Sequence, residues 1–278
     1  MIASDSLLAS ISPGGIPGDN VFWEHLHPTA SGYYAIAGMF VSEIRSMGLL
    51  GPVSPSAPLL PFVADTLGIC WLDLAYADLA IQHLTGRWPF ERYTREPAVL
   101  TSSDKALVRI ARDVYARTMR WDEGAYRTAS YFWSQGNFRE ARTTYQALLD
   151  EYPYNFYPNY LMGSLLNQQG DREGALHFYR RSIASNPGFP RSRLDLGLIM
   201  VNEGKFQDAV THLNAVLAMP DAAGMNDIRA VAHYGLAAAK ANLGDLTSAL
   251  VEVERSLALA PRSPDALALR AKLQSALR

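Results

Sequence analysis

Acid–base chemistry needs a carboxylate and an imidazole within reach of each other, and the N-terminal part of this chain supplies both. Glu24 and His27 are three positions apart in the run EHLHPT. On a tight loop this spacing brings the carboxylate to the ring Nδ1–H, which fixes the imidazole tautomer. His25 offers a competing imidazole. A metal site is disfavoured because no third or fourth ligand lies nearby, so we predict no metal and no cofactor. The simplest alternative makes all three residues part of a surface loop.

The flanking residues extend this motif over residues 17–38, PGDNVFWEHLHPTASGYYAIAG. The segment resembles the last block of SGNH/GDSL-type hydrolases, which has the form D-x-x-H-P-T-x-x-G-Y. The resemblance implies that His27 is the general base that takes the proton of a catalytic serine. It implies that Glu24 is the acid that orients the imidazole, although the family has the shorter Asp at this place.

The other parts of such an active site are not found in the chain. In the family a Gly-Asp-Ser nucleophile segment and the Gly and Asn oxyanion donors precede the block, whereas here about 20 residues precede it. Either the chain is the C-terminal part of a longer protein with a hydrolase-like domain, or residues 1–50 are a relic without catalysis. In both cases we expect no turnover by this chain alone, because a base without its nucleophile and oxyanion hole contributes little.

The second half of the chain repeats itself at a nearly fixed period. The four glycines at 136, 170, 204 and 244 each precede an alanine by five residues, at intervals of 34, 34 and 40 residues. Units that begin at Asp122, Phe156, Pro190 and Ala230 share a small residue at position 8, alanine at 20, an apolar residue at 24 and proline near 32. Small residues let two helices pack closely, and proline ends a helix. The six additional residues of the third interval are expected to lengthen its second helix or the turn that follows.

This pattern resembles the tetratricopeptide repeat (TPR) family over residues 122–263. The resemblance implies an all-α fold, a right-handed superhelical solenoid of about four repeats, with residues 264–277 as a capping helix. Helical periodicity also predicts helices over residues 29–48 and 64–84, and a third that begins near Ser103. We therefore divide the chain into a hydrolase-like remnant (1–50), a helical connector (51–121) and a TPR array (122–278).

In TPR arrays the first helix of each unit lines a concave groove, largely through positions 2, 5, 9 and 12. The candidate groove residues here are mostly aromatic or apolar: Tyr126, Trp133, Tyr157, Tyr160, Asn167, Arg191, Leu194, Leu198 and Tyr234. They favour an apolar peptide or helix as the ligand, or another part of the same polypeptide. The lysines with which some TPR domains hold a C-terminal carboxylate are missing. The alternative is that these side chains pack on neighbouring helices.

The amino-acid composition limits the classes of partner and the cellular locations that we expect. With 25 Lys and Arg against 27 Asp and Glu, the net charge of −2 offers no basic excess for nucleic acid. The single cysteine, Cys70, excludes an internal disulfide and slightly favours a cytoplasmic location. No apolar run is long enough for a membrane span. The sequence thus predicts a non-catalytic protein-interaction module, with the C-terminal part of an ester hydrolase as the alternative.

Overall fold

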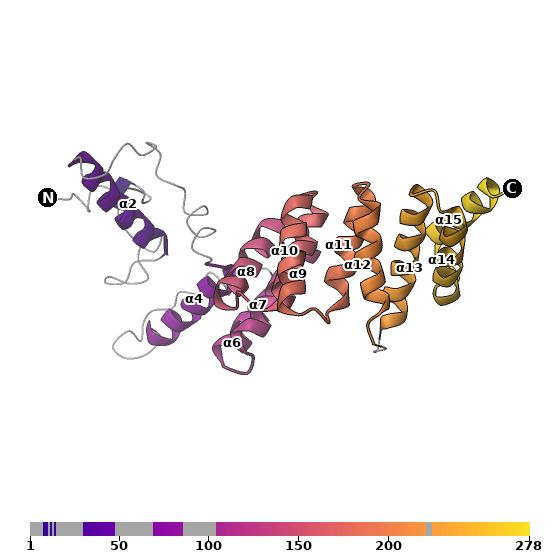
Figure 1. Cartoon of the computed structure of the whole chain (residues 1–278). Coiled ribbons are helices and arrows are strands. Elements are labelled where there is room, and N and C mark those ends of the chain that lie inside the picture. Colours follow the sequence, from indigo (N-terminus) through magenta and orange to yellow (C-terminus); the bar gives the residue numbers. More distant parts are fainter. Residues whose placement is uncertain are drawn as a thin grey trace. The chain divides into compact units, whose positions relative to one another are not determined.

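A computed structural model describes residues 8–10, 12, 14, 30–47, 69–85, 104–220 and 224–278. Every regular element in these ranges is a helix, as predicted, and none of these helices is long and apolar enough to cross a membrane. The chain forms two compact units, Met1–Ala147 and Leu148–Arg278. We describe each by itself (Figure 1).

Unit 1 contains five long helices in its described ranges: α2 (Ala30–Ser46), α4 (Trp71–Thr85), α6 (Lys105–Tyr115), α7 (Trp121–Ser134) and the larger part of α8 (Phe138–Glu151). Helices α4, α6 and α7 pack on one another. The N-cap of α6 is Asp104, one residue after the predicted Ser103, because the Asp104 carboxylate accepts hydrogen bonds from the backbone N–H groups of Ala106 and Leu107.

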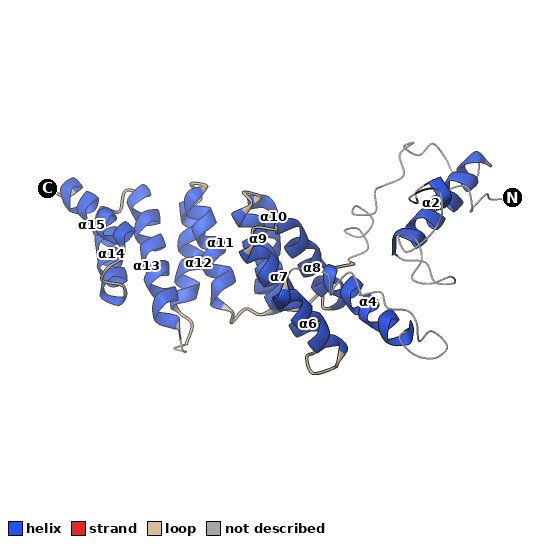
Figure 2. Ribbon diagram, turned by 180° about the vertical axis from the view of Figure 1, so that it is seen from behind, coloured by secondary structure: helices blue, strands red, loops and turns tan. Residues whose placement is uncertain are grey.

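Unit 2 is a row of helices connected by short turns. They are α9 (Phe156–Gln168), α10 (Arg172–Ser185), α11 (Pro190–Asn202), α12 (Phe206–Leu217), α13 (Met225–Asn242), α14 (Leu246–Leu259) and α15 (Pro264–Ala276). Both views show them side by side in chain order (Figures 1 and 2). Each helix packs on the next, and the first helices of successive hairpins, α11 and α13, also pack on each other.

The helix ends follow from local sequence. Asn155, Asp171, Asp245 and Ser263 accept hydrogen bonds at helix N-termini. The turns inside the hairpins each contain one of the four periodic glycines, with φ between 73° and 86°. Few side chains tolerate this left-handed conformation, so the glycine period marks the turn of each hairpin.

Small residues bring the two helices of a hairpin together, as predicted. The alanines at position 20, residues 141, 175, 209 and 249, are fully buried. A Cβ added to Gly163 would lie 2.8 Å from two ring carbons of Tyr179, and one added to Gly197 would lie 2.9 Å from Leu213. A Cβ on Gly235, in the next hairpin, would also lie 2.9 Å from Leu213. Leu213, at position 24 of the third repeat, therefore packs within its own repeat and against the next one.

The additional residues of the third interval are distributed differently from the prediction. Helix α12, the second helix of that unit, has 12 residues and is shorter than α10, which has 14. The turn after α12 is longer, as allowed for, but most of the insertion extends α13 to 18 residues. Met225 and Ile228 are buried, and burial of these two apolar side chains accounts for the helical extension.

Candidate functional site

The proposed acid–base pair and the candidate binding residues fall in different parts of the chain. Glu24 and His27 lie outside the described residues, so their roles remain predictions. Within the described ranges, no group of three or more His, Cys, Asp or Glu side chains could hold a metal ion. The site that the structure does describe is built from the first helices of the repeats in unit 2.

Four aromatic rings form what we call the aromatic cluster: Phe156, Tyr157 and Tyr160 on α9, and Phe189 just before α11. The ring of Phe189 lies 4.9 Å from that of Phe156 and 5.1 Å from that of Tyr160, between centroids. Tyr157 and Tyr160 stack at 6.3 Å with an interplanar angle of 26°. These separations are those of favourable aromatic pairs. Tyr157 is 42% exposed, and the other three rings are half-buried. The cluster thus offers accessible aromatic surface.

A polar layer supports this cluster. The Tyr179 hydroxyl donates to Ser164 Oγ at 3.2 Å, and Ser164 Oγ donates to the Tyr160 carbonyl at 3.1 Å. Burial raises the pKa of Asp195 on α11 to about 6, although hydrogen bonding with Tyr160 and the nearby charge of Arg191 act in the opposite direction. Burial, and then the negative charge of Asp195, raise the pKa of Tyr160. This layer joins α9, α10 and α11 beneath the exposed rings.

The other candidate residues of unit 2 differ in accessibility. Asn167 and Arg191 are exposed, and Leu198 is half-buried. Leu194 is only 7% exposed, so it contributes mainly to packing. Tyr234 packs against the C-terminal core formed by α13, α14 and α15, and burial raises the pKa of its hydroxyl. The accessible part of the predicted face is therefore concentrated on α9 and the start of α11.

Two candidate residues belong to unit 1. Tyr126 and Trp133 lie on α7 and are half-buried. The Trp133 ring contacts that of the fully buried Tyr145 edge to face, with centroids 6.1 Å apart. Trp133 is thus partly anchored in the first hairpin.

Phe189 and Asp195 were not identified from the sequence. Phe189 lies in the turn between two repeats of unit 2, where we expected only a reversal of the chain. A bulky apolar residue directly before Pro190 was the feature of the sequence that could have indicated its role. Asp195 lies between the buried residues Leu194 and Leu196, and a charge at such a place indicates a buried polar contact.

Comparison with known proteins agrees with this architecture. The family described as tetratricopeptide repeat matches residues 126–190, 160–227 and 194–266, which together span about half of the chain. No curated protein matches the sequence.

Among solved structures, MamA (residue 41 to the end) from Desulfovibrio magneticus RS-1 is similar with a TM-score of 0.50 and 18% identity, over 56% of this chain and 85% of that one. YrrB, described as a TPR protein with an unusual peptide-binding site, is similar with a TM-score of 0.49 and 16% identity, over 76% of this chain and 96% of that one. TTC0263, a TPR protein from Thermus thermophilus, has a TM-score of 0.45 and 21% identity, over 62% of this chain and 88% of that one.

Paired helices, periodic turns and small residues at the contacts thus coincide with the family match, and the chain belongs to the tetratricopeptide repeat family.

Proposed function

We propose that unit 2 binds an apolar segment of a protein partner on the aromatic cluster. TPR scaffolds serve as surfaces for protein and peptide partners. The observation that carries the proposal is the set of four rings on α9 and before α11, in which Tyr157 is 42% exposed. Exposed aromatic side chains supply much of the binding energy at protein interfaces. Their position on the face formed by the first helices agrees with the binding positions that the family resemblance implies.

The support under the cluster favours binding. Tyr160 contacts Phe189, Tyr157 and Tyr179, so its ring is fixed before a partner arrives. A surface that is already ordered loses less conformational entropy when it binds. Arg191, exposed on the first turn of α11, adds a positive charge beside the rings. We therefore expect the bound segment to carry bulky apolar side chains, with an acidic residue or backbone carbonyl near Arg191.

Alanine at Tyr157 is expected to weaken binding of such a segment by about tenfold, because loss of an interface aromatic typically costs about 1–2 kcal/mol or more. The probe is a peptide selected from a random display library against the whole chain, measured by fluorescence anisotropy. Tyr154→Ala is the matched control, because Tyr154 is 88% exposed and makes none of the contacts in the cluster.

Tyr160→Ala should act in the same direction, and Tyr160→Phe should retain most of the affinity, because the ring contacts remain. Equal affinity of the selected peptides for wild type, Tyr157→Ala and Tyr160→Ala would refute the proposed site. A synthetic peptide of residues 48–68, tested alongside, determines whether the segment comes from the same polypeptide.

We also propose that residues 1–50 belong to an SGNH/GDSL-type hydrolase domain in which Glu24 and His27 are the acid and the base. One observation favours this. Helix α2, which begins within the motif, and the residue directly after it expose apolar side chains: Tyr33, Phe40, Val41, Ile44 and Met47 are between 37% and 61% exposed. Exposed apolar residues gathered on one helix usually indicate a surface that another body covers.

This second proposal predicts a Gly-Asp-Ser segment encoded upstream of residue 1. The longer protein should cleave p-nitrophenyl acetate, and His27→Ala should reduce the rate by a factor on the order of 10³ or more. His25→Ala is the control, because the competing imidazole has no role in the proposed pair. An upstream sequence without a serine nucleophile, or activity unchanged in His27→Ala, would eliminate this function.

A further inference from the structure

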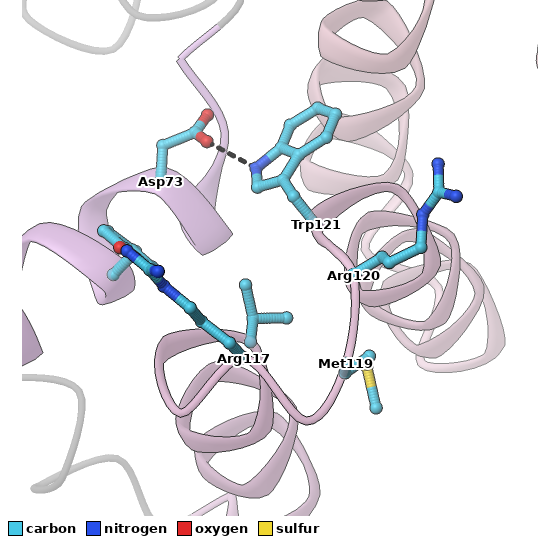
Figure 3. Close-up of a pocket in the computed structure, with 7 residues that line it drawn as sticks. Asp73, Arg117, Met119, Arg120 and Trp121 are labelled. Atoms are coloured by element: carbon cyan, nitrogen blue, oxygen red, sulfur yellow. Dashed lines mark hydrogen bonds between the residues drawn. The ribbon is translucent and has the colours of Figure 1, made fainter.

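Unit 1 contains a cavity that the proposed functions do not use. It has a volume of about 520 Å³ and is lined by α4, α6, the turn after α6 and the start of α7: Asp73, Tyr76, Val114, Arg117, Met119, Arg120 and Trp121 (Figure 3). Most of its exposed lining is apolar. A cavity of this size accommodates a small ligand or one bulky side chain with its adjoining backbone.

The only carboxylate in the lining is already hydrogen-bonded. Asp73 Oδ1 accepts from Trp121 Nε1 at 2.9 Å, the contact drawn in Figure 3, and Asp73 Oδ2 accepts from the backbone N–H of Cys70 at 2.9 Å. Two N–H groups therefore stabilise the negative charge at the rim. The same contact fixes the indole of Trp121, so one wall of the cavity is rigid.

The two arginines of the lining differ. Arg120 forms a bidentate pair with Asp122 at 2.9 and 3.1 Å, and its guanidinium points away from Asp73 and Arg117 (Figure 3). Arg117 is exposed and has no ion-pair partner among the described residues. Its backbone has φ 59°, in the left-handed region that a residue with a Cβ rarely adopts. An arginine thus occupies a turn position that suits glycine, beside a largely apolar cavity.

We propose that this cavity binds a carboxylate carried on an apolar stem. Arg117 pairs with the carboxylate, because a guanidinium matches its geometry with two parallel N–H donors. Tyr76, Val114 and Trp121 surround the stem. The last residue of a peptide chain and a small free carboxylic acid both present this chemistry. The site lies in unit 1 and is independent of the aromatic cluster.

The test uses the ¹⁵N-labelled whole chain and follows the indole N–H resonances of its five tryptophans. Trp121 is assigned by Trp121→Phe and reports on the cavity directly. The probes are N-acetylphenylalanine, its C-terminal amide and 3-phenylpropionate. We expect saturable shifts of the Trp121 resonance with the acids, and at least about tenfold weaker binding of the amide, because it lacks the charge that Arg117 recognises.

Arg117→Gly should weaken binding of the acids by about tenfold or more without lowering the Tm, since glycine adopts φ 59° without strain. Arg117→Gln removes the charge while keeping a side chain. Arg109→Gln is the charge-matched control, because Arg109 is 85% exposed, lies on α6 and does not line the cavity.

Tighter binding of N-acetylphenylalanine than of 3-phenylpropionate would identify a peptide terminus as the ligand, and the reverse order a free acid. Either result supports a carboxylate site. The proposal is overturned if neither acid shifts the Trp121 resonance. It is also overturned if the amide binds as tightly as the acid, or if the Arg117 variants bind as tightly as Arg109→Gln.

Discussion

Replacing Tyr179 by alanine is expected to lower the free energy of unfolding by about 3–5 kcal/mol, the usual cost of removing a large buried aromatic ring. Tyr179 is 1% exposed on α10, and its ring contacts Tyr160 and the backbone at Gly163. Each hairpin is stabilised by its neighbours, so the loss weakens α9 and α11 together with α10. Urea denaturation followed by far-UV circular dichroism measures the effect.

Tyr154→Ala is the matched control, since Tyr154 is 88% exposed and its loss should change stability by less than about 0.5 kcal/mol. Tyr179→Phe separates packing from hydrogen bonding, and loss of the bond to Ser164 should cost about 1 kcal/mol. If Tyr179→Ala were as stable as Tyr154→Ala, the assignment of position 24 to the core of each repeat would be wrong.

A second variant tests the contact itself. In the wild type, Gly163→Ala places a Cβ 2.8 Å from the Tyr179 ring and should destabilise the protein. In the Tyr179→Ala background the ring is gone, and the higher helix propensity of alanine opposes the remaining crowding at the Ala175 carbonyl. Gly163→Ala should therefore cost clearly less in that background. Equal costs would mean that the two residues do not interact.

The repeat architecture was predictable because it depends on features with a fixed period. A glycine in each hairpin turn, such as Gly170 with φ 83°, and a fully buried alanine five residues later recur in each unit. Both follow from local requirements, a left-handed turn and a close contact between two helices, that few residue types satisfy. The sequence therefore determines which residues pair within a hairpin, and the structure agrees.

The candidate site was less predictable because its contacts join residues from different repeats. Positions 2, 5, 9 and 12 identify Tyr157 and Tyr160, but not Phe189 in the turn or Asp195 on α11. The position of Phe189 depends on how one hairpin stacks on the next. The N-terminal extension of α13 likewise depends on packing between hairpins. Met225 and Ile228 stand in a stretch rich in turn residues, and only their burial in unit 2 favours the helix.

The contact between α13 and α14 also includes a charge cluster that sequence spacing did not indicate. Glu252 is 6% exposed. Its Oε2 lies 2.7 Å from His233 Nδ1, and its Oε1 accepts from Lys240 Nζ at 2.8 Å and lies 3.4 Å from an Arg255 nitrogen. One buried carboxylate thus contacts three basic side chains from two helices, and its removal takes away the contact that they share.

Glu252→Ala should therefore lower the free energy of unfolding by about 2–4 kcal/mol, somewhat below the usual cost of breaking a fully buried pair, because Arg255 is 59% exposed. Glu254→Ala is the control on the same helix. Glu254 is 49% exposed and 3.8 Å from Arg270, so its loss should change stability by less than about 1 kcal/mol. Comparable losses in the two variants would contradict a structural role for the buried cluster.

The same carboxylate makes stability depend on pH. Burial alone would raise the pKa of Glu252, but hydrogen bonds from Lys240 and His233 outweigh it and hold the folded pKa below the ordinary value of 4.5. Because the folded pKa is the lower one, this stabilisation is fully present above about pH 4.5 and is lost as the pH falls through the folded pKa.

Urea denaturation at a series of pH values should show that Glu252→Gln, which carries no charge, reduces the stability difference between neutral and acidic pH. Glu254→Gln should retain that difference, and if both variants retained it in full, the charge of Glu252 would have no part in holding α13 to α14.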